Sequence, residues 1–211
     1  MCEPIKKIEK IPESYSPKNK PEIISMAENL CTEKILETVV IEGVEFTVIQ
    51  KAKTIYAGSY FVAPDLNSEP DVEASWQWFQ NNRGKIVDSV TPDCMICLSI
   101  DYAISERPCA MLHGQETVSV NQPEGVHVIE AEPTILIKVP STDAAWALTK
   151  KLTGEENPQW HMAPLFSLIR HIFEREPYNY VFNGSNGTGN EEAEYYCSNG
   201  DQYVTVPVKR S

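Results

Sequence analysis

Residues 192–208 read EAEYYCSNGDQYVTVPV, and this stretch predicts a β-hairpin near the end of the chain. β-Branched and aromatic residues favour strands, and the Asn199-Gly200 pair between them is the strongest short-range signal for a hairpin turn. Alternation along the first strand places Glu194 and Tyr196 on one face and Tyr195 on the other. Burying a carboxylate is costly unless something pairs with it, and aromatic faces attract cations. The hairpin therefore points to a pocket for a flat or positively charged small molecule.

Composition excludes several classes of protein. The chain has 211 residues, 42% hydrophobic and 23% charged, which suits one large globular domain. Its formal net charge of −12 opposes direct binding of nucleic acid. No apolar run approaches the length of a transmembrane helix, and the charged N-terminus lacks the apolar core of a secretory signal. We therefore expect a cytoplasmic protein with no direct nucleic-acid or membrane partner.

The cysteines do not form a metal motif. Six cysteines stand at positions 2, 31, 94, 97, 109 and 197. Cys94 and Cys97 form a single C-x-x-C, whereas a zinc site needs four ligands, and the four histidines show no matching spacing. A disulfide framework is typical of short secreted chains. We interpret the cysteines as structural and expect no metal and no other cofactor.

The order of predicted elements indicates a duplication. Residues 1–43 are interpreted as an N-terminal extension, partly extended because of its prolines or helical because of weak periodicity at Met26–Leu36. The order strand, helix, strand, strand then occurs twice, over about 44–120 and 124–209. An insert at about 141–163 adds a helix and a loop to the second half. Residues 44–209 would thus form one domain of two halves.

In the first half we expect a strand from Val44 to Tyr60 with a break near Gly58. A helix from Asp71 to Arg83 should pack its apolar stripe on the sheet, and two strands, at about 94–102 and 108–120, should follow. The helix stripe consists of Val72, Trp76 and Phe79.

In the second half we expect a strand over Val126–Val139 that is interrupted at Pro133. Ser141 or Thr142 should cap a helix that stops before Gly154. A second helix, from Pro164, carries an apolar stripe, and a Gly/Asn loop over about 179–190 leads to the final hairpin.

The predicted fold class is α+β, with tandem duplicated β-α-β-β units. Each unit would be an open three-stranded sheet with a helix on one face, and neither unit buries its apolar surface well alone. Pairing the units about a pseudo-twofold axis would close the core and leave a central ligand cleft at their junction, where ligand sites are common.

Four stretches carry a resemblance to a known family. They are Phe46–Gln50 running to Gly58, Gly125–Val139, Glu194-Tyr195-Tyr196, and Tyr203–Val208. Over about 44–209 the chain resembles the gyrase-inhibitor-like small-molecule-binding domain, also known as the effector-binding domain of bacterial transcription activators. The resemblance implies the two-unit fold and a cleft in which an acidic residue of an E-x-Y motif, here Glu194 with Tyr196, receives lipophilic cations. The chain departs from the family in its insert and long N-terminal tail, and no DNA-binding domain is recognised.

Aromatic residues are the expected walls of the cleft. Each has a plainer interpretation as core or surface packing, and Glu194 itself could belong to a solvated acidic run with Glu191 and Glu192. The predicted ligand-binding residues are Glu194, Tyr196, Tyr56, Tyr60, Trp76, Tyr102, Trp146, Trp160 and Tyr180.

The leading hypothesis is a stand-alone protein that senses or sequesters amphipathic, aromatic or cationic xenobiotics, as multidrug-binding relatives do, and that acts alone or through a separate regulatory protein. No catalytic motif is evident, so we do not expect an enzyme. One alternative is a hydrolase of strained electrophilic molecules, in which Glu194 activates water and Tyr196 donates a proton. Another is a protein-binding module such as a gyrase inhibitor.

Overall fold

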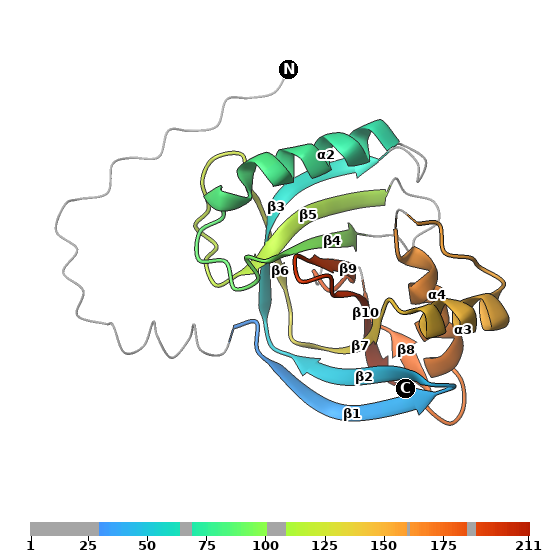
Figure 1. The fold of residues 1–211 in the computed structure, drawn as a ribbon. Helices are drawn as coiled ribbons and strands as arrows, with labels where there is room; N and C mark the ends of the chain where they lie inside the picture. The colour runs from blue at the N-terminus through green and yellow to red at the C-terminus, as the bar shows by residue number, and fades with distance from the viewer. Residues whose placement is uncertain (1–29, 64–68, 101–108, 160, 185–188) are drawn as a thin grey trace, which may run out of the picture.

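The chain folds into an α+β protein in which helices cover a curved antiparallel sheet (Figure 1). The computed structural model describes residues 30–63, 69–100, 109–159, 161–184 and 189–211. Within these ranges the α-helices are α2 (Glu69–Asn82), α3 (Asp143–Thr153) and α4 (Ala163–Phe173), and Arg83–Lys85 form a short 3-10 helix. The strands are β1 (Glu33–Ile41), β2 (Val44–Lys51), β3 (Thr54–Ala63), β4 (Cys94–Ile100), β5 (Cys109–Thr117), β6 (His127–Ala131), β7 (Thr134–Pro140), β8 (Tyr180–Phe182), β9 (Glu192–Cys197) and β10 (Gln202–Arg210).

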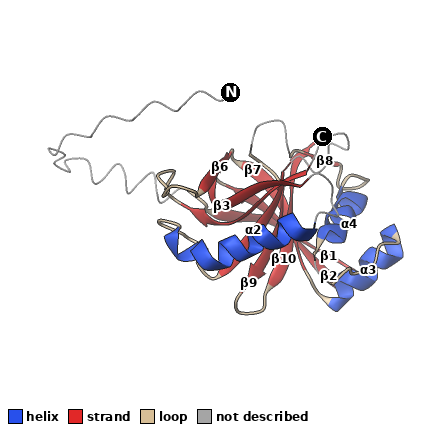
Figure 2. Cartoon of the chain, turned by 90° about the horizontal axis from the view of Figure 1, so that it is seen from above, coloured by secondary structure: helices blue, strands red, loops and turns tan. Residues whose placement is uncertain are grey.

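All strands of the described residues belong to one ten-stranded sheet, in the order β1-β2-β7-β10-β9-β4-β5-β3-β6, with β8 beside β10. β2 continues into β3, and β6 continues into β7 across the predicted interruption at Pro133. β2 pairs with β7 and β3 pairs with β6, so these two interrupted segments lie side by side. The sheet therefore curls, with helices on one face and an inner face opposite (Figures 1 and 2).

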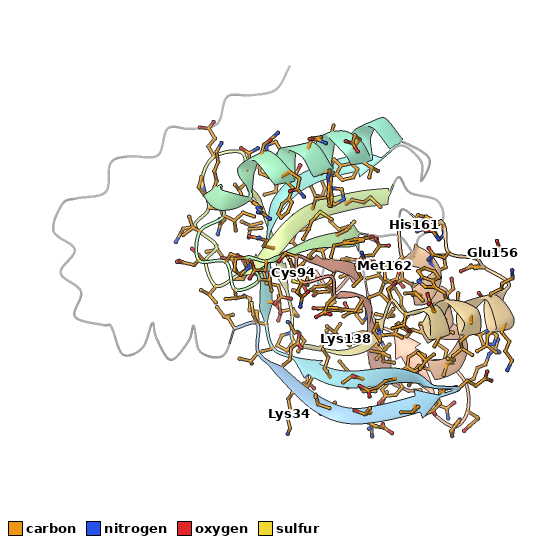
Figure 3. All side chains as sticks on the ribbon, in the orientation of Figure 1. Lys34, Cys94, Lys138, Glu156, His161 and Met162 are labelled. Atoms are coloured by element: carbon orange, nitrogen blue, oxygen red, sulfur yellow. A yellow bond between two sulfur atoms is a disulfide. The ribbon has the colours of Figure 1, made fainter. Side chains whose placement is uncertain are left out.

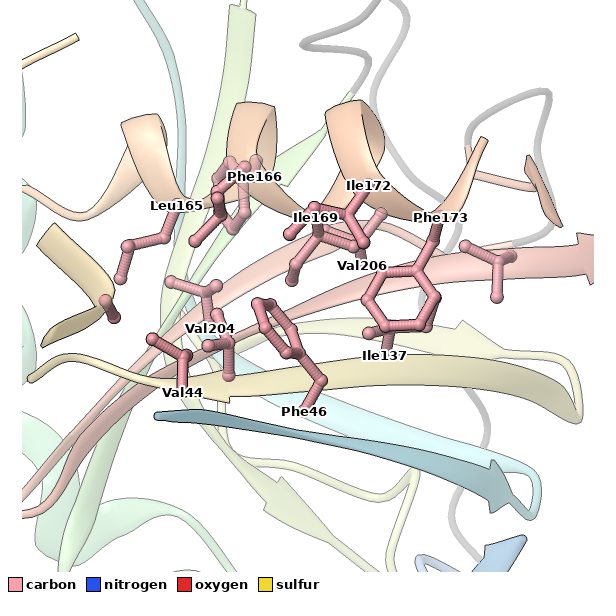
Figure 4. Close-up of a cluster of buried hydrophobic side chains, with 14 of the residues drawn as sticks. Val44, Phe46, Ile137, Leu165, Phe166, Ile169, Ile172, Phe173, Val204 and Val206 are labelled. Carbon is pink, nitrogen blue, oxygen red and sulfur yellow. The ribbon is translucent and has the colours of Figure 1, made fainter. Parts of the chain in front are cut away.

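The largest core cluster lies between α4 and the sheet (Figure 4). The predicted stripe of α4 is buried, and Phe46 of β2 and Val206 of β10 meet it from the sheet. Burying a side chain of this size contributes about 1.5–3 kcal/mol, so this layer fixes α4 on β2, β7 and β10. Phe173 also packs edge-on against Phe46, with ring centroids 5.3 Å apart.

A smaller cluster holds α2 on the other part of the sheet. Phe79 of the predicted stripe is buried against Met95 of β4, and Trp76 is half-buried at its edge. Tyr196 of β9 packs against both this cluster and the α4 cluster. It therefore lies where the surface covered by α2 meets the surface covered by α3 and α4.

The predicted signals at the ends of α3 are confirmed. Thr142 accepts a hydrogen bond from the backbone N–H of Ala145, which satisfies one of the free donors of the first turn. Gly154 ends the helix with φ +80°, in the left-handed region that favours glycine. Pro164 lies in the first turn of α4, as expected.

Three expectations about local structure were wrong. Glu33–Leu36 are part of strand β1 rather than of a helix, because β1 pairs with β2 over Glu33–Ile41. Tyr180–Phe182 form β8 against β10 within the expected Gly/Asn loop. Gly58 does not break a strand: a Cβ there would lie 2.1 Å from the carbonyl oxygen of His113, so the glycine permits close approach of β3 and β5.

The sequence also did not indicate a disulfide, yet Cys94 and Cys197 are bonded across β4 and β9. The two cysteines are 103 residues apart in sequence, and only the pairing of these strands brings them together. The separate three-stranded sheets that we expected are likewise replaced by one continuous sheet in the described residues.

Candidate functional site

Strand β9 places its polar residues on the helix-covered face. Ala193 and Tyr195 belong to the cluster of the inner face, while Tyr196 packs on the helix side. Glu194 shares the helix side, because its side chain bonds to Tyr196 and to the residue before α4. The predicted alternation of the strand is therefore confirmed, and the helix-side residues are the ones near α4.

Glu194 is buried but has no cationic partner. Its side chain is 5% exposed and accepts hydrogen bonds from the backbone N–H of Met162, at 2.9 Å, and from the hydroxyl of Tyr196, at 2.5 Å. Among the ion pairs of the described residues, none involves Glu194. Desolvation raises the pKa of Glu194 to about 7, although both hydrogen bonds lower it. With this pKa, the carboxyl group exchanges its proton near neutral pH.

A cavity of about 300 Å³ lies over Tyr196. Glu194 is not a lining residue: it lies behind the wall formed by its two hydrogen-bond partners, Tyr196 and Met162. Figure 3 labels Met162 and His161 on the segment that enters α4. The lining residues are Ser141, Trp146, Asn157, Gln159, His161, Met162, Tyr196 and Gln202.

The cavity wall combines two aromatic rings with uncharged polar groups. The indole N–H of Trp146 donates to the Ser141 hydroxyl at 3.0 Å, which fixes the ring. The backbone N–H of Ala163 donates to Nδ1 of His161 at 3.1 Å, and desolvation lowers the pKa of His161, so its neutral form is favoured. The carboxyl group of Glu194 accepts hydrogen bonds from two residues of this wall, Met162 and Tyr196. The chemistry of the wall suits a small ligand with an aromatic part and a donor or a positive charge.

Sequence reasoning missed a second buried carboxylate beside this site. Glu192 is 1% exposed, and its Oε1 lies 2.7 Å from a guanidinium nitrogen of Arg170 on α4. Desolvation raises the pKa of Glu192 to about 7 against the lowering effect of Arg170. The strand alternation could have placed Glu192 with Glu194, but the half-buried arginine on α4 had no sequence signal.

A further buried ionic network on the inner face was also missed. Nζ of Lys51 lies 3.0 Å from a carboxylate oxygen of Glu116 and 2.7 Å from Glu33. The hydroxyl of Tyr195 donates to Glu116 at 3.0 Å. Desolvation lowers the pKa of Lys51, but the carboxylates of Glu116 and Glu33 outweigh it and the pKa is raised. This network is fully paired and holds β2 to β5.

Four other predicted site residues, which the structure describes, do not line the cavity. Tyr56 is buried on the inner face, and Tyr60 packs beside His127 with ring centroids 5.6 Å apart. Tyr180 is buried in the α4 cluster. Trp76 shares a cluster with Tyr196 but does not line the cavity. Tyr102 and Trp160 lie outside the described residues. The structure brings together Glu194, Tyr196 and Trp146.

Neither a metal site nor a membrane-spanning helix is found in the described ranges. No group of three or more His, Cys, Asp or Glu residues in them is placed to hold a metal ion. None of the helices described is both long enough and apolar enough to cross a membrane.

Comparisons with known proteins found similar structures only. No family model and no curated protein matches the chain. An integron cassette protein from the mobile metagenome of Vibrio cholerae is similar over 78% of this chain and 95% of its own, with 12% identity and a TM-score of 0.48. The EcmrR C-terminal domain matches over 80% and 99%, with 12% identity and a TM-score of 0.49. A putative bacterial transcription regulation protein from Staphylococcus aureus matches over 79% and 99%, with 11% identity and a TM-score of 0.42.

The three structures are similar to this chain over 78–80% of its length. Their identities of 11–12% and TM-scores below 0.5 assign neither a ligand nor a partner to this chain.

Proposed function

We propose that this protein is a small-molecule-binding module of the effector-binding type, and that its ligand is a compact organic cation with an aromatic part. The observation that carries the proposal is the buried Glu194 carboxyl, which lies behind the cavity wall and forms no ion pair with any residue that the structure describes. A buried carboxylate of this kind is costly unless a positive charge is supplied. A bound cation would supply it.

The aromatic wall supports the same class of ligand. Tyr196 and Trp146 both line the cavity, and aromatic faces attract cations by about 0.5–2 kcal/mol depending on desolvation. Tyr196 donates to Glu194, so negative charge on Glu194 makes the phenol oxygen a better acceptor for a ligand N–H. The volume of about 300 Å³ is at the lower end for ligand pockets, which favours a ligand with one or two rings.

We propose further that the domain is a duplication and that the cavity belongs to the cleft between its halves. In support, β3 pairs with β5 as β7 pairs with β10, and β4 pairs with β5 as β9 pairs with β10. The pairing of β4 with β9 would then be the junction of the halves. Tyr196 lies at this junction, and ligand sites favour such places.

Binding is favoured over hydrolysis by the surroundings of Glu194. Each of its carboxylate oxygens already accepts a hydrogen bond, and Tyr196 stands between it and the cavity. A general base must reach the water that it activates, directly or through one other water. The module would sense or sequester its ligand, alone or with a separate regulatory protein.

The test uses benzyltrimethylammonium as a compact aromatic cation, with benzyl alcohol and phenylacetate as its neutral and anionic counterparts. Titration calorimetry should show that the cation binds most tightly and that its affinity rises between pH 6 and pH 8, as Glu194 ionises. Glu194→Gln should remove both the preference for the cation and the pH dependence.

The matched control is Glu124→Gln, which removes a carboxylate from an exposed position. This variant should bind the cation as the parent protein does. Equal binding of all three compounds by the parent protein, or an unchanged preference in Glu194→Gln, would reject the assigned role of Glu194.

A further inference from the structure

We propose that the Cys94–Cys197 disulfide is a reversible redox lock on the end of β9, which presents Tyr196 to the cavity. Cys94 begins β4 and Cys197 ends β9, and the two residues face each other in the pairing of these strands. On the next rung of the same ladder Met95 faces Tyr196. The bond therefore fixes the strand directly beside a residue of the cavity wall.

Apart from the packing of Tyr196, mainly backbone hydrogen bonds hold this end of β9. Cys197 is followed by an exposed turn at Ser198–Gly200. The backbone N–H of Ser198 donates to the carbonyl oxygen of Asp93 at 2.8 Å, and that of Cys197 donates to Asp201 at 2.9 Å. Strand ends that are held mainly by backbone hydrogen bonds near the surface open at low free energy. Without the disulfide, we expect the rung next to Tyr196 to open more often.

The bond is open to attack by a small thiol. Cys94 and Cys197 are both half-buried, whereas Cys97 on the same strand is buried. Disulfide exchange proceeds by attack of a thiolate on one sulfur, through a mixed disulfide. Two molecules of a thiol such as glutathione supply two electrons and two protons. The products are two cysteine thiols on the protein and one molecule of oxidised glutathione.

The link from this lock to ligand affinity rests on the proposed function, but the redox chemistry does not. With the bond formed, Tyr196 is held against β4 with its hydroxyl on Glu194. With the bond broken, only a fraction of the molecules keeps the arrangement of Tyr196 that can bind the ligand. The apparent affinity is reduced in proportion to that fraction. The oxidised protein is thus the binding form, and a reducing environment weakens binding.

The first experiment is independent of any ligand. The folded full chain is equilibrated in glutathione buffers of increasing reduced-to-oxidised ratio, and free thiols are alkylated and located by mass spectrometry. Labelling at Cys94 and Cys197 should rise together and reverse on reoxidation. If both positions stay unlabelled even in reduced glutathione alone, the bond is a permanent link and the proposal is overturned.

Hydrogen exchange of residues 194–197 then measures the opening of β9. Exchange should be about tenfold faster in the reduced protein, as expected for loss of local protection. In the double variant Cys94→Ser/Cys197→Ser, the exchange rate should equal that of the reduced protein and should not depend on the glutathione ratio. In Cys97→Ser, the exchange rate should still depend on that ratio. Equal exchange in the oxidised and reduced forms would overturn the lock.

Calorimetry with benzyltrimethylammonium completes the test. The dissociation constant should be about tenfold higher for the reduced protein if a tenth of its molecules are competent. The proposed function fails if neither form binds the cation, and the exchange measurement still decides the lock. Equal binding by both forms overturns the lock and leaves the proposed function intact.

Discussion

The hydroxyl of Tyr196 donates to the carboxyl group of Glu194, two residues earlier on the same face of β9, at 2.5 Å. Tyr196 lines the cavity, whereas Glu194 lies behind it. The phenol of Tyr196 therefore lies between the carboxyl group of Glu194 and any ligand in the cavity. Desolvation raises the pKa of Tyr196 well above its usual value, and Glu194 raises it further, so the phenol stays protonated and remains the donor.

Tyr196→Phe should separate this hydrogen bond from the packing of the ring. The variant keeps the ring between its two apolar clusters but leaves one oxygen of Glu194 with no donor. An unsatisfied buried polar group costs about 1–3 kcal/mol, and loss of the bond should raise the pKa of Glu194 further. Chemical unfolding at pH 8 measures the loss in free energy of unfolding. This loss should be smaller at pH 5, where Glu194 is neutral. An equal loss at both pH values would contradict the assignment.

Stability should fall as pH rises from about 5 to 7. The folded pKa values of Glu194 and Glu192 are each raised to about 7, so the folded state binds more protons than the unfolded state in this window. Each group contributes a slope of up to about 1.4 kcal/mol per pH unit. The stability that these two groups contribute is fully present below their pKa in the unfolded state. It is lost as the pH rises through their pKa in the folded state.

Glu194→Gln should remove about half of that slope, because Glu192 still titrates. Urea unfolding at several pH values provides the measurement. Glu124→Gln, at an exposed position, should keep the parent slope. A Glu194→Gln variant with the full slope would show that the carboxyl does not titrate near neutrality.

Local patterns predicted the elements of the fold well. The β9–β10 hairpin, the cap at Thr142 and the stop at Gly154 depend on residues a few positions apart, whose backbone preferences act locally. The pairing of β4 with β9 depends on the curl of the entire sheet, and the Cys94–Cys197 bond follows from it. No local signal could have shown that bond.

The candidate site was predictable only in part, because local patterns do not show which distant strands and helices come together. Alternation on β9 placed Glu194 with Tyr196, but the strand alone could not say which face is buried. Trp146 joins them because α3 lines the same cavity as Tyr196, whereas Tyr56 and Tyr60 follow the inner face of β3. The distance between an aromatic residue and a cavity is set by strand order, which the aromatic pattern does not encode.

Gly58→Ala should destabilise the protein through close contact between β3 and β5. The new methyl group would meet the backbone of His113 at 2.1 Å, and neither strand can yield without loss of pairing. Overpacking of this kind typically costs about 1–3 kcal/mol. Gly84→Ala is the matched control, because a Cβ there has no neighbour within 4 Å. Thermal unfolding should show a clear loss for the first variant and little change for the second.

Lys51→Met should be far more damaging than Lys53→Met, although the two lysines are neighbours. Lys51 is 3% exposed and pairs with both Glu116 and Glu33. Among the described residues, its loss leaves the buried carboxylate of Glu116 with the Tyr195 hydroxyl as its hydrogen-bond donor. Breaking a buried pair from one side typically costs about 3–5 kcal/mol.

Lys53 makes an exposed ion pair with Glu130, and exposed pairs contribute about 0–1 kcal/mol. Urea unfolding of both variants at pH 7 gives the comparison. Equal losses in the two variants would mean that this ionic network does not hold β2 to β5.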